Sequence, residues 1–248
     1  MITQYRFGLT PDCECRPMVE WAYCLYAALL EQAPPAFGNR VHGDGTSPVS
    51  QFLQLRKEVT WQVTLLGKEA EETLGPVLER EKPLWLHKER VWLAPHLLEK
   101  REIPNPDALF VMAKGFGKRQ EVRFVTPTAF KTHGIYQILP SVRLILQSTI
   151  KKWNGCFPNC PIEDEDGQGI DALAEGLLCR KLSLKDQTYF LKGRALPGFI
   201  GSIQLENRLE GFHAQLANAL LLFAGCAGVG IKTTLGMGGV LYGEQDGK

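Results

Sequence analysis

The chain has 248 residues and a mass of 27.7 kDa, enough for one large domain or two small ones with buried cores. Hydrophobic residues make up 44% and charged residues 22%, which excludes a disordered protein. The best apolar run, 214–227, is shorter than the ~18–20 residues that a membrane helix needs. The chain opens without a basic-then-apolar signal sequence, and seven scattered cysteines favour free thiols in a reducing compartment. We therefore expect a globular, cytoplasmic protein with no membrane partner.

Positive charge is concentrated in the middle of the chain, although the net charge is only +1. Residues 100–155 carry 10 basic and 3 acidic side chains, a local charge of +7. The segments before and after it carry −3 each. Such a segment can hold a polyanion, and it is equally consistent with a solvated linker and helix face. Charge alone leaves both interpretations open.

The first 105 residues follow a β-α-β-β-α-β pattern. The strongest strand signal is at 59–65, where apolar and polar residues alternate strictly. Pro17 suits the first turn of a helix, and Pro34 and Pro35 are expected to end that helix. In chain order we expect a strand at 5–9, a helix at 17–31, a loop at 38–46, strands at 49–56 and 59–65, a helix at 68–79, and a strand or hairpin over 84–86 and 91–93.

The same order of elements recurs after a predicted linker at 103–106, without any visible repeat of sequence. We expect a strand at 122–125, a helix at 140–153, a surface loop at 154–170, one or two strands within 188–205, a helix at 210–224 and a strand at 239–242. The sequence therefore predicts an α+β fold of two tandem ferredoxin-like (RRM-like, βαββαβ) domains, at 1–105 and 118–248.

Six glycines lie within the loop 225–239, which follows a predicted helix and precedes a predicted strand. A P-loop is excluded because Ile231 separates Gly230 from Lys232, and a dinucleotide fingerprint is excluded because Thr233 stands where a glycine is needed. Both motifs also open a helix, whereas this loop follows one. The loop's amides are expected to approach a phosphate backbone closely; the alternative is a flexible connection.

Two clusters raise the question of metal binding, and neither has the usual ligand spacing. Cys13, Cys15, Cys156 and Cys160 lack the common two-residue spacing of zinc sites. The acidic run 163–166 has no histidine near it. Loop thiols and a solvated loop are the preferred interpretations, so we expect neither a metal nor a cofactor.

His42 differs from the other four histidines because it lies in a loop rich in Gly, Asp and Ser, where no core is implied. Its ordinary pKa of ~6.5 suits a general acid or base. The alternative is a surface histidine without a catalytic role.

The run Gly-Val-Gly-Ile-Lys-Thr-Thr-Leu-Gly-Met-Gly-Gly at 228–239 resembles the signature of the CRISPR-associated repeat-processing endoribonucleases. The segments 124–128 and 198–201 resemble that family as well. The family is built from tandem ferredoxin-like halves, and its usual catalytic histidine lies about where His42 stands. The resemblance implies metal-independent cleavage of CRISPR repeat RNA into guide RNAs. The 2′-hydroxyl would attack the adjacent phosphate, leaving a 2′,3′-cyclic phosphate and a 5′-hydroxyl.

The resemblance also implies site residues. His42 would transfer one proton and Tyr26 a second, with Tyr23 less favoured. Many members carry a lysine shortly after the histidine, but 43–56 contains none. Arg40, Arg56 and Lys57 are candidates for the positive charge, with Arg40 preferred, and a site that works with the histidine alone is the alternative. The predicted RNA-binding residues are Arg119, Arg123, Lys131, Arg143, Lys151, Lys152, Gly228, Gly230, Lys232, Thr233, Gly236 and Gly238.

The expected partner is CRISPR repeat RNA, lying across the groove between the two halves. The resemblance also admits a homodimer and delivery of guide RNA to a CRISPR effector complex. Two other functions stay open. One is a non-catalytic RNA-binding subunit of a CRISPR effector complex, which His42 would distinguish. The other is a metal-dependent nuclease acting through 163–166, which sensitivity to a chelator would distinguish.

Overall fold

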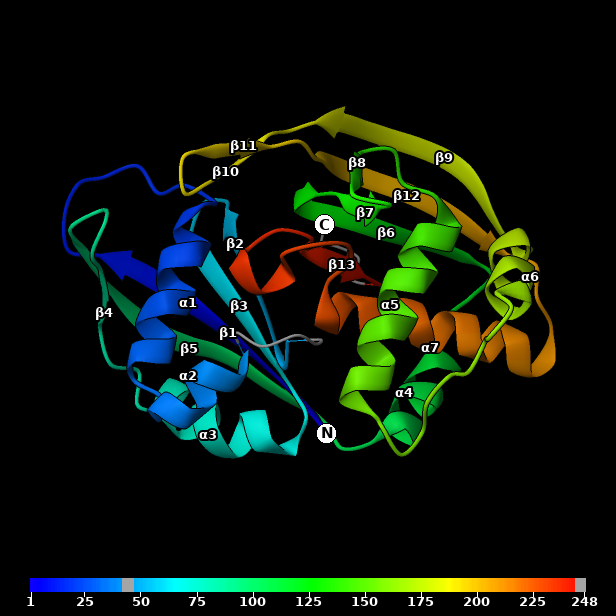
Figure 1. The fold of residues 1–248 in the computed structure, drawn as a ribbon, viewed down its shortest axis with the longest axis horizontal. Helices are drawn as coiled ribbons and strands as arrows, with labels where there is room; N and C mark the ends of the chain where they lie inside the picture. The colour runs from blue at the N-terminus through cyan, green and yellow to red at the C-terminus, as the bar shows by residue number, and fades with distance from the viewer. Residues whose placement is uncertain (42–46, 244–248) are drawn as a thin grey trace.

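The computed structural model describes residues 1–41 and 47–243, with the side chains of Asn39 and Arg40 also outside the description. The first half forms an antiparallel sheet in the order β2-β3-β1-β5-β4, with its helices on one face (Figure 1). Its elements are β1 (Ile2–Pro11), α1 (Trp21–Glu31), α2 (Pro35–Val41), β2 (Val49–Leu55), β3 (Val59–Leu66), α3 (Lys68–Leu78), β4 (Leu84–Leu86) and β5 (Val91–Ile103).

The second half forms another antiparallel sheet, in the order β13-β6-β12-β9. Its elements are α4 (Pro106–Ala113), β6 (Arg119–Thr128), β7 (Phe130–Thr132), β8 (Ile135–Gln137), α5 (Val142–Cys156), α6 (Gln168–Gly176), β9 (Leu177–Asp186), β10 (Tyr189–Leu191), β11 (Arg194–Leu196), β12 (Phe199–Asn207), α7 (Gly211–Ala227), the 3-10 helix η1 (Thr233–Leu235) and β13 (Val240–Tyr242). Two small hairpins, β7–β8 and β10–β11, form separate two-stranded sheets.

Both sheets have the strand order of a ferredoxin-like fold, so the predicted α+β class is confirmed. The division at 1–105 and 118–248 stays a prediction. None of the helices in 1–41 and 47–243 is long and apolar enough to cross a membrane.

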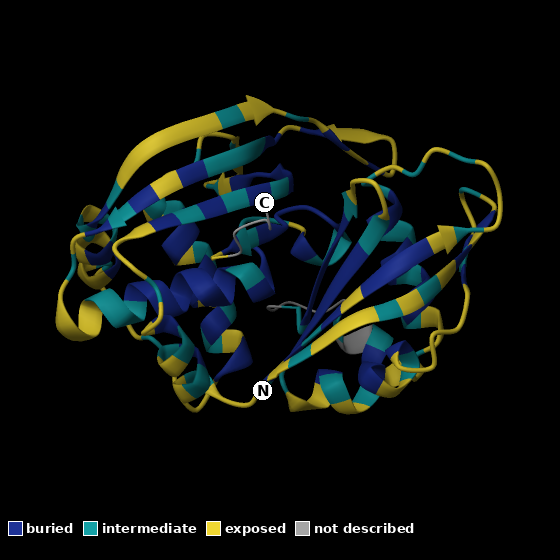
Figure 2. Ribbon diagram, turned by 180° about the vertical axis from the view of Figure 1, so that it is seen from behind, coloured by how far each residue is buried: buried dark blue, intermediate teal, exposed yellow. Residues whose placement is uncertain are grey.

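Several predicted elements need correction. The expected loop at 38–46 is wrong for residues 38–41, which belong to helix α2. This helix begins at Pro35, whose fixed φ suits a first helical turn. The expected linker is also wrong: β5 continues to Ile103, and α4 follows at once with Asn105 as its N-cap. Strand β9 was not predicted, because this edge strand has mostly exposed side chains and no alternation (Figure 2). The expected loop 154–170 is helical at both ends.

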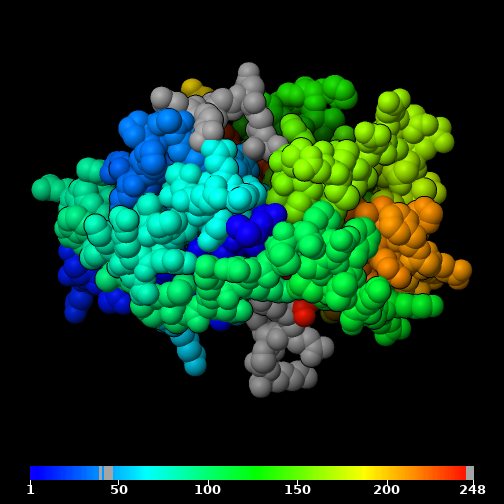
Figure 3. Space-filling model, turned by 90° about the horizontal axis from the view of Figure 1, so that it is seen from below, coloured from blue at the N-terminus to red at the C-terminus, as the bar shows by residue number. Residues whose placement is uncertain are grey.

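Two apolar cores hold the helices against the sheets. In the first half, Trp61, Val63 and Leu65 on β3 pack with residues of α1 and α3. The core of the second half contains residues of α5 and α7, and it also takes in Ile2, Leu66 and Ile103 from the first sheet. The ends of β1, β3 and β5 therefore pack into the second core. In the view from below, β5 and α4 form a continuous band that crosses from the first half to the second (Figure 3).

Gln51 on β2 is a buried polar connection between the halves. Only 1% of its surface is exposed. Its Nε2 donates to Ala22 O on α1 and to Thr234 O in η1, both at 2.8 Å, and its Oε1 accepts from Trp61 Nε1 at 2.8 Å. One side chain thus links α1, β3 and the segment that precedes β13.

We expect Gln51→Ala to lower the free energy of unfolding by about 2–4 kcal/mol, because three hydrogen bonds are lost and their buried partners are left unpaired. Urea denaturation measures this change. Gln54→Ala, on the same strand but partly exposed, serves as the control and should change stability by less than about 0.5 kcal/mol. Equal effects of the two substitutions would contradict the role given to Gln51.

Candidate functional site

The glycine-rich loop is folded between the two halves, with α1 and β2 on one side and α5 on the other (Figure 1). Gly236 has φ +99°, and a Cβ there would lie 2.4 Å from Ala22 Cβ and 2.8 Å from Tyr189 Oη. Gly230 has φ +74°, and a Cβ there would lie 2.2 Å from Ala129 O. Both positions combine the left-handed conformation with close approach of another chain segment, so they require glycine.

Backbone N–H groups along this loop donate to acceptors of the protein. The bonds are Val229 N to Gly238 O, Gly230 N to Ser148 Oγ, Ile231 N to Ala129 O, Gly238 N to Pro127 O and Gly239 N to Thr126 Oγ1, at 2.8–3.0 Å. A donor with a buried protein acceptor is not free to bind a phosphate oxygen. The expectation that the loop's amides approach a phosphate is therefore wrong for these five groups, and Gly228, Gly236 and Gly238 are buried.

Lys232 lies at the surface of the otherwise packed loop. Its backbone is left-handed, with φ +55°, and its side chain is exposed. Thr233 beside it is buried. Of the two neighbours, only Lys232 is therefore placed to meet a phosphate group from solvent.

Tyr26 is a buried phenol on α1, with 5% of its surface exposed. Burial raises its pKa to about 12, and a side-chain hydrogen bond with Ser47 opposes that rise. Ser47 Oγ also accepts from Val49 N at 3.3 Å. Because the phenol keeps its proton at neutral pH, it can act as a proton donor but not as a base there.

His42 and the side chain of Arg40 lie outside the described residues, so the structure gives no position for either. The chain on both sides of His42 is described. Helix α2 ends at Val41, and Phe37 anchors that helix in the first core. On the other side, Ser47 contacts Tyr26. Both flanks of the predicted catalytic residue are thus fixed to the first half.

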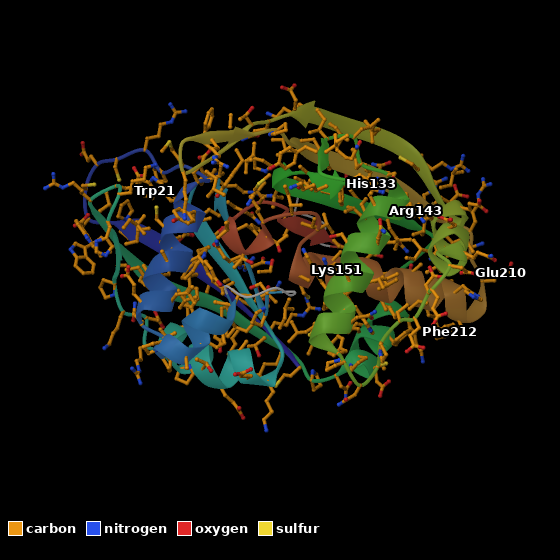
Figure 4. All side chains as sticks on the ribbon, in the orientation of Figure 1. Trp21, His133, Arg143, Lys151, Glu210 and Phe212 are labelled. Carbon is orange, nitrogen blue, oxygen red and sulfur yellow. The ribbon has the colours of Figure 1, made fainter. Side chains whose placement is uncertain are left out.

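The three predicted RNA-binding residues on α5 point in different directions. Arg143, near the start of the helix, forms an ion pair with Asp171 of α6 (Figure 4). Lys151 is exposed, whereas Lys152 turns inward and donates to the glycine-rich loop. Neighbouring residues of a helix are ~100° apart, so Lys151 and Lys152 cannot share a narrow face. Arg143, Lys151 and Lys152 therefore do not all lie along one face of α5.

The predicted basic residues on β6 and β7 lie apart from α5. Arg119 and Arg123 are on the sheet face opposite the helices, because the alternate residues Val122 and Phe124 enter the core. Arg123 forms an ion pair with Glu121 at 3.1 Å. On β7, Lys131 places its ammonium 5.8 Å from the ring centroid of Tyr136. The second sheet therefore separates Arg119 and Arg123 from α5.

Several residues that hold the loop have no local sequence pattern that would predict this role. Gln51 is an ordinary polar residue in a strand pattern, and Ser148 lies within a helix pattern. Tyr189 on β10 donates its hydroxyl to Leu235 O. Their partners are far away in the chain, so only the fold identifies them. Within 1–41 and 47–243, no group of three or more His, Cys, Asp or Glu side chains is placed to hold a metal ion.

The family described as "CRISPR-associated endoribonuclease Cas6" matches residues 122–240, which include the glycine-rich loop. Cas6 of Streptococcus thermophilus is 27% identical over 231 residues, 92% of this chain and 94% of its own length. Cas6 of Mycobacterium tuberculosis is 27% identical over 224 residues, 87% of this chain and 69% of its own length. The chain is similar to the Cas6 family over residues 122–240 and to these relatives over most of its length. The resemblance predicted from the loop sequence is thereby confirmed.

Solved Cas6 structures share the fold. A Cas6 product complex matches with a TM-score of 0.78 at 22% identity, covering 98% of this chain and all of that chain. Thermus thermophilus Cas6 matches with a TM-score of 0.68, also at 22% identity, covering 98% of each chain. A histidine-to-alanine mutant of Cas6 matches with a TM-score of 0.72. These likenesses place the tandem arrangement of the two sheets within the Cas6 fold.

We expect Gly230→Ala to destabilise the protein more than Gly193→Ala. The two glycines have nearly the same φ, +74° and +76°, but a Cβ at Gly193 meets open space. The left-handed conformation costs about 1–2 kcal/mol in both variants. The overlap with Ala129 O should add about 1–3 kcal/mol to Gly230→Ala alone. Urea denaturation of both variants measures the difference, and equal losses would show that the close approach is not a constraint.

Proposed function

We propose that this chain is an endoribonuclease that cleaves CRISPR repeat RNA to make guide RNAs, without a metal ion, with His42 and Tyr26 as its proton-transfer groups. The observation that carries the proposal is the contact of Tyr26 with Ser47, at the end of the segment that contains His42. The match of the Cas6 family model over the glycine-rich loop, and the similarity to Cas6 relatives, support the choice of RNA substrate. The similar structures include Cas6 complexes with a product and with a substrate mimic.

The proposed reaction needs one proton acceptor and one proton donor. The RNA 2′-hydroxyl loses its proton to a base, and its oxygen forms a bond to the adjacent phosphorus. The bond from phosphorus to the 5′-oxygen breaks, and that oxygen takes a proton from an acid. The products are a 2′,3′-cyclic phosphate and a 5′-hydroxyl, so atoms and charge balance without a co-reactant.

The two groups suit different halves of this reaction. Tyr26 keeps its proton at neutral pH, since burial raises its pKa to about 12, and therefore suits donation to the leaving oxygen or to a phosphate oxygen. A histidine with an ordinary pKa of ~6.5 suits removal of the proton from the 2′-hydroxyl. We assign the base to His42 on this ground, and Arg40 to stabilisation of the charge on the phosphate.

We place the RNA on the helix-bearing side of the molecule, over α1, the glycine-rich loop and α5. Lys232 and Lys151 are exposed lysines on that path. Arg119 and Arg123 project from the opposite face of the second sheet, so any contact they make is with a different segment of the RNA. The homodimer, the effector complex and the cytoplasmic location stay predictions.

His42→Ala should lower the single-turnover cleavage rate of repeat RNA ~10²–10⁴-fold while changing RNA affinity little, because it removes a group that acts in the transition state. His213→Ala, at an exposed position on α7, is the matched control and should cleave normally.

Three outcomes would contradict the proposal. Cleavage by His42→Ala at the wild-type rate would show that His42 is not the catalyst and would make Tyr26 and His133 the next candidates. If the wild-type chain binds the RNA and cuts nothing, it is a non-catalytic binding subunit. Loss of cleavage with EDTA would instead indicate a metal-dependent nuclease.

Tyr26→Phe should slow cleavage ~10²-fold, because it removes the proton of the phenol and keeps the buried ring. Tyr23→Phe is the matched control on the same helix. The ring of Tyr23 lies under Lys192, 5.2 Å from the ammonium, and a phenylalanine preserves that contact. Single-turnover rates measured for both variants over pH 5–9 provide the test. A normal rate for Tyr26→Phe would remove Tyr26 from the mechanism.

A further inference from the structure

Helix α5 turns one ammonium group into the protein, against the glycine-rich loop. Lys152 Nζ lies 3.1 Å from Ala227 O, 2.9 Å from Gly228 O and 3.1 Å from Thr233 Oγ1. An ammonium has three N–H donors, and here each has an acceptor. Burial of the group lowers its pKa to about 7. A side chain held in this way has no donor left for an RNA phosphate.

The acceptors of Lys152 lie at the C-terminal end of α7, where a nearby cation is favourable. Ala227 is the last residue of α7, and Gly228 follows as its C-cap. The last carbonyl groups of a helix have no partners within the helix and carry a partial negative charge. Lys152 therefore caps α7, and through Thr233 it joins that end of the helix to η1.

The same helix holds the loop at a second point. Ser148 Oγ accepts a hydrogen bond from Gly230 N at 2.8 Å, one helical turn before Lys152. On its other side, the loop meets the first half of the molecule. Gln51 donates to Thr234 O, and Gly236 packs closely against Ala22 of α1. The loop is thus fixed between α5 and the helix that carries Tyr26.

We infer that Lys152 is a positioning residue for the cleavage site: its ammonium fixes the glycine-rich loop, which in turn fixes α1 and Tyr26. The consequence for cleavage rests on the function proposed above; the fixing of the loop does not. This role replaces the phosphate contact predicted for Lys152 from the sequence. The neighbouring Lys151, exposed on the same helix, keeps the predicted phosphate contact.

Hydrogen exchange of the loop tests the inference without RNA. Lys152→Met leaves an unbranched side chain one atom shorter and removes its three donors. We expect amides in 228–239 to exchange about 10-fold faster or more in this variant, because the loop opens more easily. Lys151→Met should leave that exchange unchanged. Unchanged exchange in Lys152→Met would overturn the inference.

RNA assays then separate positioning from phosphate binding. Lys152→Met should slow single-turnover cleavage, by up to ~10²-fold, with an unchanged salt dependence of RNA affinity. Lys151→Met should weaken binding and reduce that salt dependence. If Lys152→Met instead behaves as Lys151→Met does, Lys152 contacts phosphate and the inference is wrong. If the wild-type chain cleaves no repeat RNA, the proposed function fails, while hydrogen exchange still decides whether Lys152 fixes the loop.

A milder variant keeps the test valid if Lys152→Met does not fold. Thr233→Val is nearly isosteric and removes only the hydroxyl acceptor of Lys152. Faster exchange in 228–239 of this variant would support the inference. Exchange at the wild-type rate would overturn it, because Thr233 is the acceptor that joins Lys152 to η1.

Discussion

The glycine-rich loop passes between two packed halves, and at Gly230 and Gly236 there is no room for a side chain. At Gly230 the carbonyl of Ala129, and at Gly236 the side chain of Ala22, occupies the space that a Cβ would need. Both glycines also have left-handed backbone conformations. Because each neighbour belongs to a different half of the chain, these contacts fix the position of one ferredoxin-like unit relative to the other. The placement of α1 and α5 on opposite sides of the loop depends on them.

Hydrogen bonds of buried polar groups fix the orientation of the segments that this packing brings together. Gln51 joins α1, β3 and η1, and Lys152 joins α5, α7 and η1. Apolar contacts tolerate small shifts, whereas hydrogen bonds between buried groups are lost when the geometry changes. The loop is therefore held by oriented bonds from both halves. A site for RNA cleavage needs this kind of support, since its proton-transfer groups act only when they are aligned with the substrate.

The basic side chains of the middle segment, residues 100–155, do not form one surface. Arg143 is engaged with Asp171 and Arg123 with Glu121, while Arg119 and Arg123 face away from the helices. Lys151 and Lys232 are exposed near the loop. Tyr26, in contrast, is buried, and burial raises its pKa to about 12, so the phenol keeps its proton at neutral pH. The exposed lysines and the buried phenol therefore lie in different environments.

The fold class and the resemblance to Cas6 could be predicted from the sequence, because strand alternation, helix signals and the glycine-rich run are local patterns. The resemblance also named Tyr26 and His42 as candidates, and their roles stay predictions. Only the tertiary structure decided that loop amides are already bonded, that Lys152 turns inward while Lys151 stays exposed, and that Gln51 links the halves. These outcomes depend on acceptors far away in the chain, such as Ala129 O for Ile231 and Gly228 O for Lys152. A local pattern specifies which groups a residue offers, whereas the packing of distant segments decides which partners those groups meet.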